Sequence, residues 1–183
     1  MDLSHHFLLS MPQMRDSHFR ESLIYLLDHD KHGAFGVVIN HNLGMQLGEV
    51  LLQLQIKPDT DTISEITVLR GGPVDPGHGL VLHPPGNDYE CTRNFGSDVS
   101  MSSSRDVLEA IAHHEGPEDY LVLLGHAGWG PGQLEVEIAD NAWLTCPATT
   151  DIIFHTALDE RRHAVGEKFG IKLEQMVGHA GHA

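Results

Sequence analysis

The spacing of apolar and polar positions predicts strands and helices along the whole chain. Apolar runs at 23–27 and 35–39 flank a polar segment that ends in Gly33, a pattern typical of a β-hairpin. Apolar residues between 47 and 54 then recur at helical spacing until Pro58. This second pattern predicts an amphipathic helix after the hairpin.

The middle of the chain predicts further strands around a turn-rich connection. Residues 66–69 and 80–82 are short apolar runs on either side of a connection rich in glycine and proline at 71–77. A helix is expected to start near Ser103, and a fully apolar strand is expected at 120–124. The region between 84 and 102 reads as a long loop.

The last third predicts two more helices and a strand. Residues 131–142 favour a helix, although 134–138 also alternates as a strand would. A strand is expected at 143–146, a short helical turn at 151–155 and a final helix at 159–169.

Length and composition then set the scale of the fold. The chain has 183 residues, of which 40% are hydrophobic and 20% charged, as in globular proteins. We expect a single α+β domain over residues 1–176 and a disordered tail at 177–183.

The charge balance argues against nucleic acid as a direct partner. There are 11 Lys and Arg against 26 Asp and Glu, which gives a net charge of −15 with the 15 histidines neutral. Nucleic-acid affinity comes largely from cations that replace counterions on phosphate, and this chain has no basic tract. A protein partner or a small ligand is favoured instead.

Cysteine usage and hydropathy favour a reducing, aqueous compartment. Cys91 and Cys146 form no C-x-x-C pair, and no apolar run approaches the length of a membrane span. The N-terminal apolar stretch at 7–11 is short and lacks a basic leader. We therefore expect a cytoplasmic protein without membrane contact.

The common phosphate-binding and catalytic motifs are missing from the sequence. It contains no P-loop, dinucleotide fingerprint, nucleophile elbow or zinc-protease signature. No cofactor, metal or enzyme class is indicated by motif.

One glycine-rich cluster stands out as a candidate binding surface. It runs from Gly125 to Glu135, and we expect a strand to enter a turn there and then a helix whose N-terminal amides attract anions. Trp129 and Gln133 would line the mouth of this anion-binding site. Alternatively, the small residues let the helix pack closely on the sheet while Trp129 fills core. The predicted surface consists of Gly128, Trp129, Gly130, Gln133 and Glu135, with Gly71, Gly72 and Pro73 nearby.

Two other hypotheses remain open from the residues alone. A hydrolase-like enzyme could use His126 or Cys146 together with a carboxylate such as Glu135. A metal site could form at Asp28, His29 and His32, although turn chemistry explains the same residues. The connection at 70–79 could also wrap a small anion with backbone amides, or serve as a tight crossover between strands.

Six segments of the chain form a recognisable combination. They are 7–12 (FLLSMP), 19–25 (FRESLIY), 33–40 (GAFGVVIN), 71–74 (GGPV), 125–135 (GHAGWGPGQLE) and 137–144 (EIADNAWL). In combination they resemble the AlgH/YqgE family, a bacterial group of mostly uncharacterised proteins. The match runs in family order over nearly the whole chain, although His126 stands where many members have a tyrosine.

The resemblance implies a fold and leaves the chemistry open. It implies an α+β domain whose large, mixed, partly barrel-like sheet carries helices around it. Members are often labelled transcriptional regulators. Because a net charge of −15 argues against direct contact with DNA, this label favours regulation through a protein partner here. The leading hypothesis is a non-enzymatic binding or regulatory protein.

Overall fold

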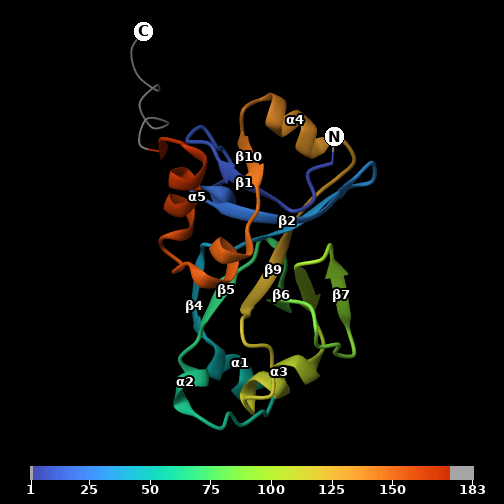
Figure 1. Ribbon diagram of the computed structural model, residues 1–183, viewed down its shortest axis with the longest axis vertical. Helices are drawn as coiled ribbons and strands as arrows, with labels where there is room; N and C mark the ends of the chain where they lie inside the picture. Colours follow the sequence, from blue (N-terminus) through green and yellow to red (C-terminus); the bar gives the residue numbers. More distant parts are fainter. Residues whose placement is uncertain (1, 174–183) are drawn as a thin grey trace.

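The computed structural model describes residues 2–173 and shows one sheet with helices at both ends (Figure 1). The strands are β1 (His6–Ser10), β2 (Leu23–Asp30), β3 (Gly33–Val38), β4 (Asn42–Gln46), β5 (Thr67–Arg70), β6 (Val74–His83), β7 (Thr92–Phe95), β8 (Val99–Ser102), β9 (Leu121–Trp129) and β10 (Trp143–Pro147). The helices are η1 (Ser17–Phe19), α1 (Leu47–Gln53), α2 (Asp61–Ser64), α3 (Arg105–Ala112), α4 (Gln133–Ala139), η2 (Asp151–His155) and α5 (Arg161–Phe169). The predicted tail at 177–183 lies outside the described residues.

The ten strands form one mixed sheet with β9 at its centre. The order is β10-β1-β2-β3-β9-β6-β8-β7, and β5 joins β9 while β4 pairs with β5. The β5–β9 pair is parallel and the other pairs are antiparallel. The predicted α+β fold with a large, mixed, partly barrel-like sheet flanked by helices is confirmed.

Strand β9 joins the two halves of this sheet because different partners use its two ends. Leu123 and Leu124 pair with β5 and β6, whereas residues 127–129 pair with β3. We predicted that the strand would end in a turn after residue 124, and this is wrong. Gly125, at φ +76°, bends the strand without ending it.

Two glycines allow the chain to cross β9 at very close range. A Cβ atom on Gly71 would lie 2.2 Å from the Gly125 carbonyl oxygen, and one on Gly72 would lie 2.1 Å from the His126 oxygen. Both glycines are buried. The glycine-rich connection therefore includes a tight crossover, the structural alternative that the sequence left open.

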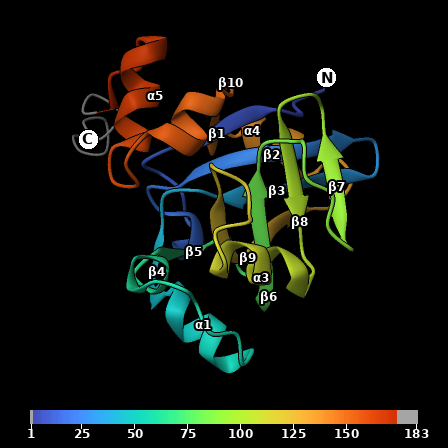
Figure 2. The same cartoon turned by 60° about the horizontal axis from the view of Figure 1, so that its bottom comes forward.

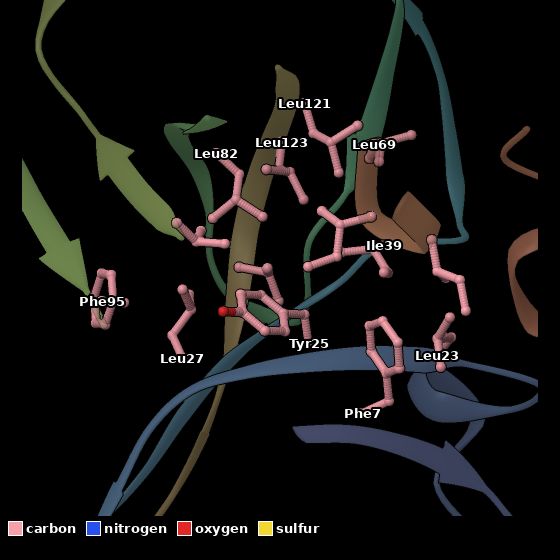
Figure 3. Packing of buried hydrophobic residues seen from close by; sticks show 14 of the residues in the cluster. Phe7, Leu23, Tyr25, Leu27, Ile39, Leu69, Leu82, Phe95, Leu121 and Leu123 are labelled. Atoms are coloured by element: carbon pink, nitrogen blue, oxygen red, sulfur yellow. The ribbon is translucent and has the colours of Figure 1, made fainter. Parts of the chain in front are cut away.

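Three apolar clusters fill the space on either side of the sheet. Figure 3 shows part of the largest, in which Phe7 and Tyr25 meet Leu82 and Leu123. A second cluster lies between the sheet and α1, α2 and α3, and a third lies beneath α4. Figures 1 and 2 show α1 and α3 at one end of the molecule and α4 and α5 at the other.

The sequence-based predictions succeeded where apolar periodicity was strong. The β2–β3 hairpin, α1, α3, α4, β10, η2 and α5 are confirmed. The long loop predicted at 84–102 is wrong in its second half, where β7 and β8 pair with each other. Their buried polar residues, such as Ser100 and Ser102, hid the strand pattern.

Within residues 2–173, no helix combines the length and the apolar character that a membrane span requires.

Candidate functional site

Trp129, the centre of the predicted binding surface, is a core residue. Only 6% of it is exposed, and its Nε1 donates a hydrogen bond of 2.9 Å to Glu137 Oε2. Trp143 Nε1 donates to the same oxygen at 2.7 Å. The expectation that the Trp129 indole lines a mouth is wrong, because strand alternation turns Ala127 and Trp129 inward and leaves Gly128 outside.

The loop after Trp129 is likewise bonded within the chain. Gly130 N donates to Gln133 Oε1 at 3.0 Å, and Gln133 Nε2 donates to Glu137 Oε1 at 2.9 Å. Gln133 and Glu137 thus tie the loop and both indoles to α4. The Gly130 amide in the turn before α4 therefore already has a partner, and the arrangement fixes α4 on the sheet.

Glu135 points to a different histidine from the one considered in the enzyme hypothesis. His29 Nδ1 accepts a hydrogen bond from Leu3 N at 3.1 Å, so the neutral ring carries its proton on Nε2 and donates to Glu135 Oε1 at 3.0 Å. A bond from its own backbone N–H is the main factor that lowers the pKa of Glu135, and the contact with His29 adds to it. This pair fastens the N-terminal segment to α4.

The remaining members of the predicted surface do not form one accessible hollow. Gly71 and Gly72 are buried against β9, while Pro73, Gly128 and Gly130 are exposed.

Burial governs both the thiol and the imidazole that were considered for catalysis. Cys146 is 6% exposed, and burial raises its pKa to about 11, which makes it a poor nucleophile. His126 packs its ring 4.9 Å from that of Phe35, and burial is the main cause of its lowered pKa. Within residues 2–173, no carboxylate or thiol is hydrogen-bonded to the His126 ring.

The proposed metal ligands also have other roles. Asp28 forms an ion pair with Arg93, His29 is bonded to Leu3 and Glu135, and His32 is exposed. In the part of the chain that the structure describes, no three His, Cys, Asp or Glu side chains come together as a metal site.

The most site-like feature is a cavity of about 410 Å³ between α1 and α3. It lies over strands β6 and β9, and we call it the α1/α3 cavity. Gly79, Leu80 and Leu124 contribute strand residues to its wall, and Val50 and Val107 contribute helical ones. Cavities of about 300 to 1,000 Å³ with mainly apolar walls are typical of small-ligand sites.

The polar part of the α1/α3 cavity lies at the start of α3. Ser103, Ser104 and Arg105 line it there, and the lining includes no Asp or Glu. Arg105 Nε donates to Glu109 Oε1 and its Nη1 donates to Leu54 O, both at 2.6 Å. These bonds hold the guanidinium in place, and its Nη2 has no partner within residues 2–173.

One wall of the α1/α3 cavity is held by a directed chain of hydrogen bonds. His83 Nδ1 donates to Pro84 O at 2.8 Å, so the neutral ring accepts at Nε2 from Ser102 Oγ, also at 2.8 Å. Burial lowers the pKa of His83 and favours this neutral form. Thr92 Oγ1 lies 2.8 Å from Ser102 Oγ and extends the chain.

Sequence reasoning missed this cavity because its walls come from six separate elements, β4, α1, β6, β8, α3 and β9. Gly77 and Gly79 fall within the segment at 70–79 that was considered for anion binding, and Ser103 was recognised only as a helix start. The sequence did contain one indication of the cavity: the apolar stripes of the two helices, around Val50 and Val107, pack against the same sheet.

Comparisons with known proteins agree with this fold. The AlgH-like family model matches residues 7–174. The UPF0301 protein AlgH of Pseudomonas aeruginosa is 47% identical over 99% of this chain and 96% of its own length. The UPF0301 protein of Thioalkalivibrio sulfidiphilus is 44% identical over 100% of this chain and 97% of its own length.

Two solved structures extend the comparison. The solution structure of AlgH from P. aeruginosa superposes with a TM-score of 0.82 at 46% identity and covers 100% of this chain and 97% of that chain. The crystal structure of DIP2367 from Corynebacterium diphtheriae gives a TM-score of 0.74 at 18% identity, over 96% and 91% of the two chains, and shows the shared fold alone. The family model and the full-length relatives establish that this chain belongs to the AlgH-like family.

Proposed function

We propose that this protein is a non-enzymatic cytoplasmic binding protein that takes a small amphiphilic ligand into the α1/α3 cavity. The ligand would have an apolar body and an acidic head. The observation that carries this proposal is a cavity lining with one arginine and no carboxylate in a chain of net charge −15. In such a chain, the lining is unusually favourable to an anion.

The two ends of the α1/α3 cavity suit the two ends of such a ligand. Leu80, Val107 and Leu124 offer an apolar surface to the body, and burial of that surface favours binding by about 25 cal/mol per Å². Arg105 offers the N–H groups of its Nη2 to the head, since Nε and Nη1 are bonded to Glu109 and Leu54, and a carboxylate is a good partner for a guanidinium N–H.

The acidic side chains close to Arg105 leave part of its guanidinium free to bind a ligand. Glu109 takes the Nε–H of Arg105. Asp106 accepts from Val107 N and Ser104 Oγ with one oxygen and from Glu90 N with the other, and so is held by the chain.

A regulatory role would be exerted through a protein partner that distinguishes the occupied from the empty cavity. Direct contact with nucleic acid is disfavoured by the net charge of −15. Leu52, on α1, is 77% exposed and offers an apolar contact outside the lining of the cavity.

Isothermal titration with octanoate tests the proposal, with octanol as the neutral comparison. Gly79→Leu should abolish octanoate binding, because a Cβ at this position lies 3.8 Å from Leu124 Cδ2 and the larger side chain would occupy the cavity. Gly128→Leu is the matched control, since a Cβ there meets nothing within 4 Å and the residue lies outside the cavity. Equal binding by both variants would refute the proposed site.

The role of the head group is tested separately. Arg105→Gln should weaken octanoate about tenfold, the equivalent of roughly 1.4 kcal/mol, and leave octanol unchanged. Arg93→Gln removes the same charge from an exposed ion pair with Asp28 and should leave both affinities unchanged. A similar loss in both variants would mean that only the net charge matters.

A further inference from the structure

Another hollow, of about 530 Å³, lies where η1, the start of β4 and the end of β5 meet. We call it the Arg70 hollow, and it shares no residue with the α1/α3 cavity. All six of its lining residues are polar: Ser17, His18, Asn40, His41, Asn42 and Arg70. The lining therefore suits a polar ligand and offers little to an apolar one.

The Arg70 hollow is positively charged in a strongly acidic protein. Arg70 contributes a permanent charge, and among the described residues the lining contains no Asp or Glu, although the chain has 26 of them. Burial is the main cause of the lowered pKa of His41, and the charge of Arg70 lowers it further. Glu21 opposes this shift, and Asp16 is bonded to His18. Arg70 therefore acts on the His41 ring more strongly than Glu21 does.

Three exposed side chains offer free hydrogen-bond donors to a ligand in this hollow. They are the guanidinium of Arg70, the Nδ2 group of Asn42 and the hydroxyl of Ser17. None of these groups forms a hydrogen bond within residues 2–173. Because all three side chains are exposed, a ligand can reach them without a change in the fold.

Hydrogen bonds within the chain hold this part of the surface in place. Asn42 Oδ1 accepts from Gly44 N at 2.7 Å, which orients the Nδ2 group. The side chain of Asn40 is bonded at both ends. Arg70 N donates to His41 O at 2.9 Å, which keeps the end of β5 beside the start of β4. Groups that are held before binding lose less conformational entropy when a ligand arrives.

Two arginines of α5 add positive charge beneath this surface. Arg161 is 6% exposed and donates to the carbonyl oxygens of Thr156 and Ile39, and Ile39 directly precedes Asn40 in the lining. Arg162 is half-buried and also donates to two backbone carbonyl oxygens. In the part of the chain that the structure describes, neither guanidinium is bonded to a carboxylate. Charges in the protein interior are screened less than exposed ones, so they favour an anion at the neighbouring surface.

A phosphate group matches these donors and this charge. An esterified phosphate carries about two negative charges at neutral pH and has three strong acceptor oxygens. Arg70 can bind two of these oxygens with parallel N–H groups, and Asn42 and Ser17 can donate to the phosphate as well. The volume of about 530 Å³ leaves room for a small group that carries the phosphate.

We propose that the Arg70 hollow binds a small polar phosphomonoester, with Arg70 as the counter-ion and with Asn42 and Ser17 as donors to the phosphate oxygens. The rest of the ligand is hydroxylated, because the lining offers only polar groups to it. This site is independent of the α1/α3 cavity and of the amphiphilic ligand proposed for it.

The first test is a titration of the full chain with glycerol 3-phosphate, followed by amide NMR, with glycerol as the uncharged comparison. Saturable shifts at Ser17, Asn42 and Arg70 are expected with glycerol 3-phosphate alone. Arg70→Gln should weaken binding about tenfold or more, whereas Arg93→Gln, which removes the same charge outside the hollow, should not. Equal responses to both compounds, no saturable response, or equal losses in the two variants would overturn the proposal.

The second test separates binding from folding. Asn42→Asp keeps the oxygen that accepts from Gly44 N, so the melting temperature should change little, while the new carboxylate should abolish glycerol 3-phosphate binding. Asn87→Asp adds the same charge at an exposed position outside the hollow and should leave binding unchanged. Undiminished binding by Asn42→Asp, or an equal loss in Asn87→Asp, would contradict the place given to the phosphate.

Discussion

The carboxylate of Glu137 should be among the largest single contributors to stability on α4. One of its oxygens accepts from both Trp129 and Trp143, and the other accepts from Gln133. Glu137→Ala removes all three acceptor contacts at once. The two indoles are 6% and 3% exposed, whereas Glu137 is partly exposed, so water can replace the lost partner only in part.

The expected loss can be worked out from these contacts. Each buried indole N–H left without an acceptor costs about 1–3 kcal/mol, whereas the exposed Gln133 can turn to water at little cost. Two such groups give about 2–6 kcal/mol, and we expect about 3 kcal/mol of unfolding free energy because Glu137 is partly exposed and water can reach some of the space that it leaves. In a domain of this size it corresponds to a melting temperature lower by about 6–12 °C.

Urea unfolding followed by far-ultraviolet circular dichroism measures this loss, because tryptophan fluorescence would itself change in the variant. Glu118→Ala, at an exposed position without a hydrogen bond in the described chain, is the control and should change stability by less than about 0.5 kcal/mol. A loss of similarly small size for Glu137→Ala would refute the view that this carboxylate holds α4 on the sheet.

Three further predictions concern individual residues. Gly72→Ala should prevent stable folding, measured as loss of the cooperative thermal transition, because its Cβ would lie 2.1 Å from the His126 oxygen. Cys91 is exposed and should react with a thiol reagent at pH 8, whereas Cys146, with a pKa raised to about 11, should react only on unfolding. The pKa of His83 is lowered by burial in the folded state, so the unfolded chain binds this proton more readily and the associated stability is lost as the pH falls below about 6.5. Unfolding at pH 7.5 and 5.5 should therefore show a smaller pH dependence in His83→Phe than in the original protein.

The elements that sequence reasoning predicted are those with strong apolar periodicity. The β2–β3 hairpin follows from two apolar runs around a polar turn, and α3 follows from a stripe that includes Val107 and Ile111. Strands β7 and β8 escaped because residues such as Thr92 and Ser102 satisfy each other across the sheet, so a polar sequence is buried.

The site was harder to predict than the fold because a cavity depends on distant residues. Trp129 was assigned to a surface because the glycines around it suggested a turn, yet strand alternation with Ala127 was a signal for burial. The α1/α3 cavity depends on the distance between two helices that are about fifty residues apart in sequence. No local sequence pattern reports such a distance. The absence of Asp and Glu from the cavity lining around Arg105 becomes visible only once the chain is folded.

The measurement that tests the account most directly is an amide NMR map of octanoate binding to the full chain. Binding in the α1/α3 cavity predicts the largest shifts at Gly79, Val107 and Leu124, with little change at Gly130 and Gln133. Shifts concentrated at Gly130 and Gln133 would contradict the account and return the binding surface to the glycine-rich loop.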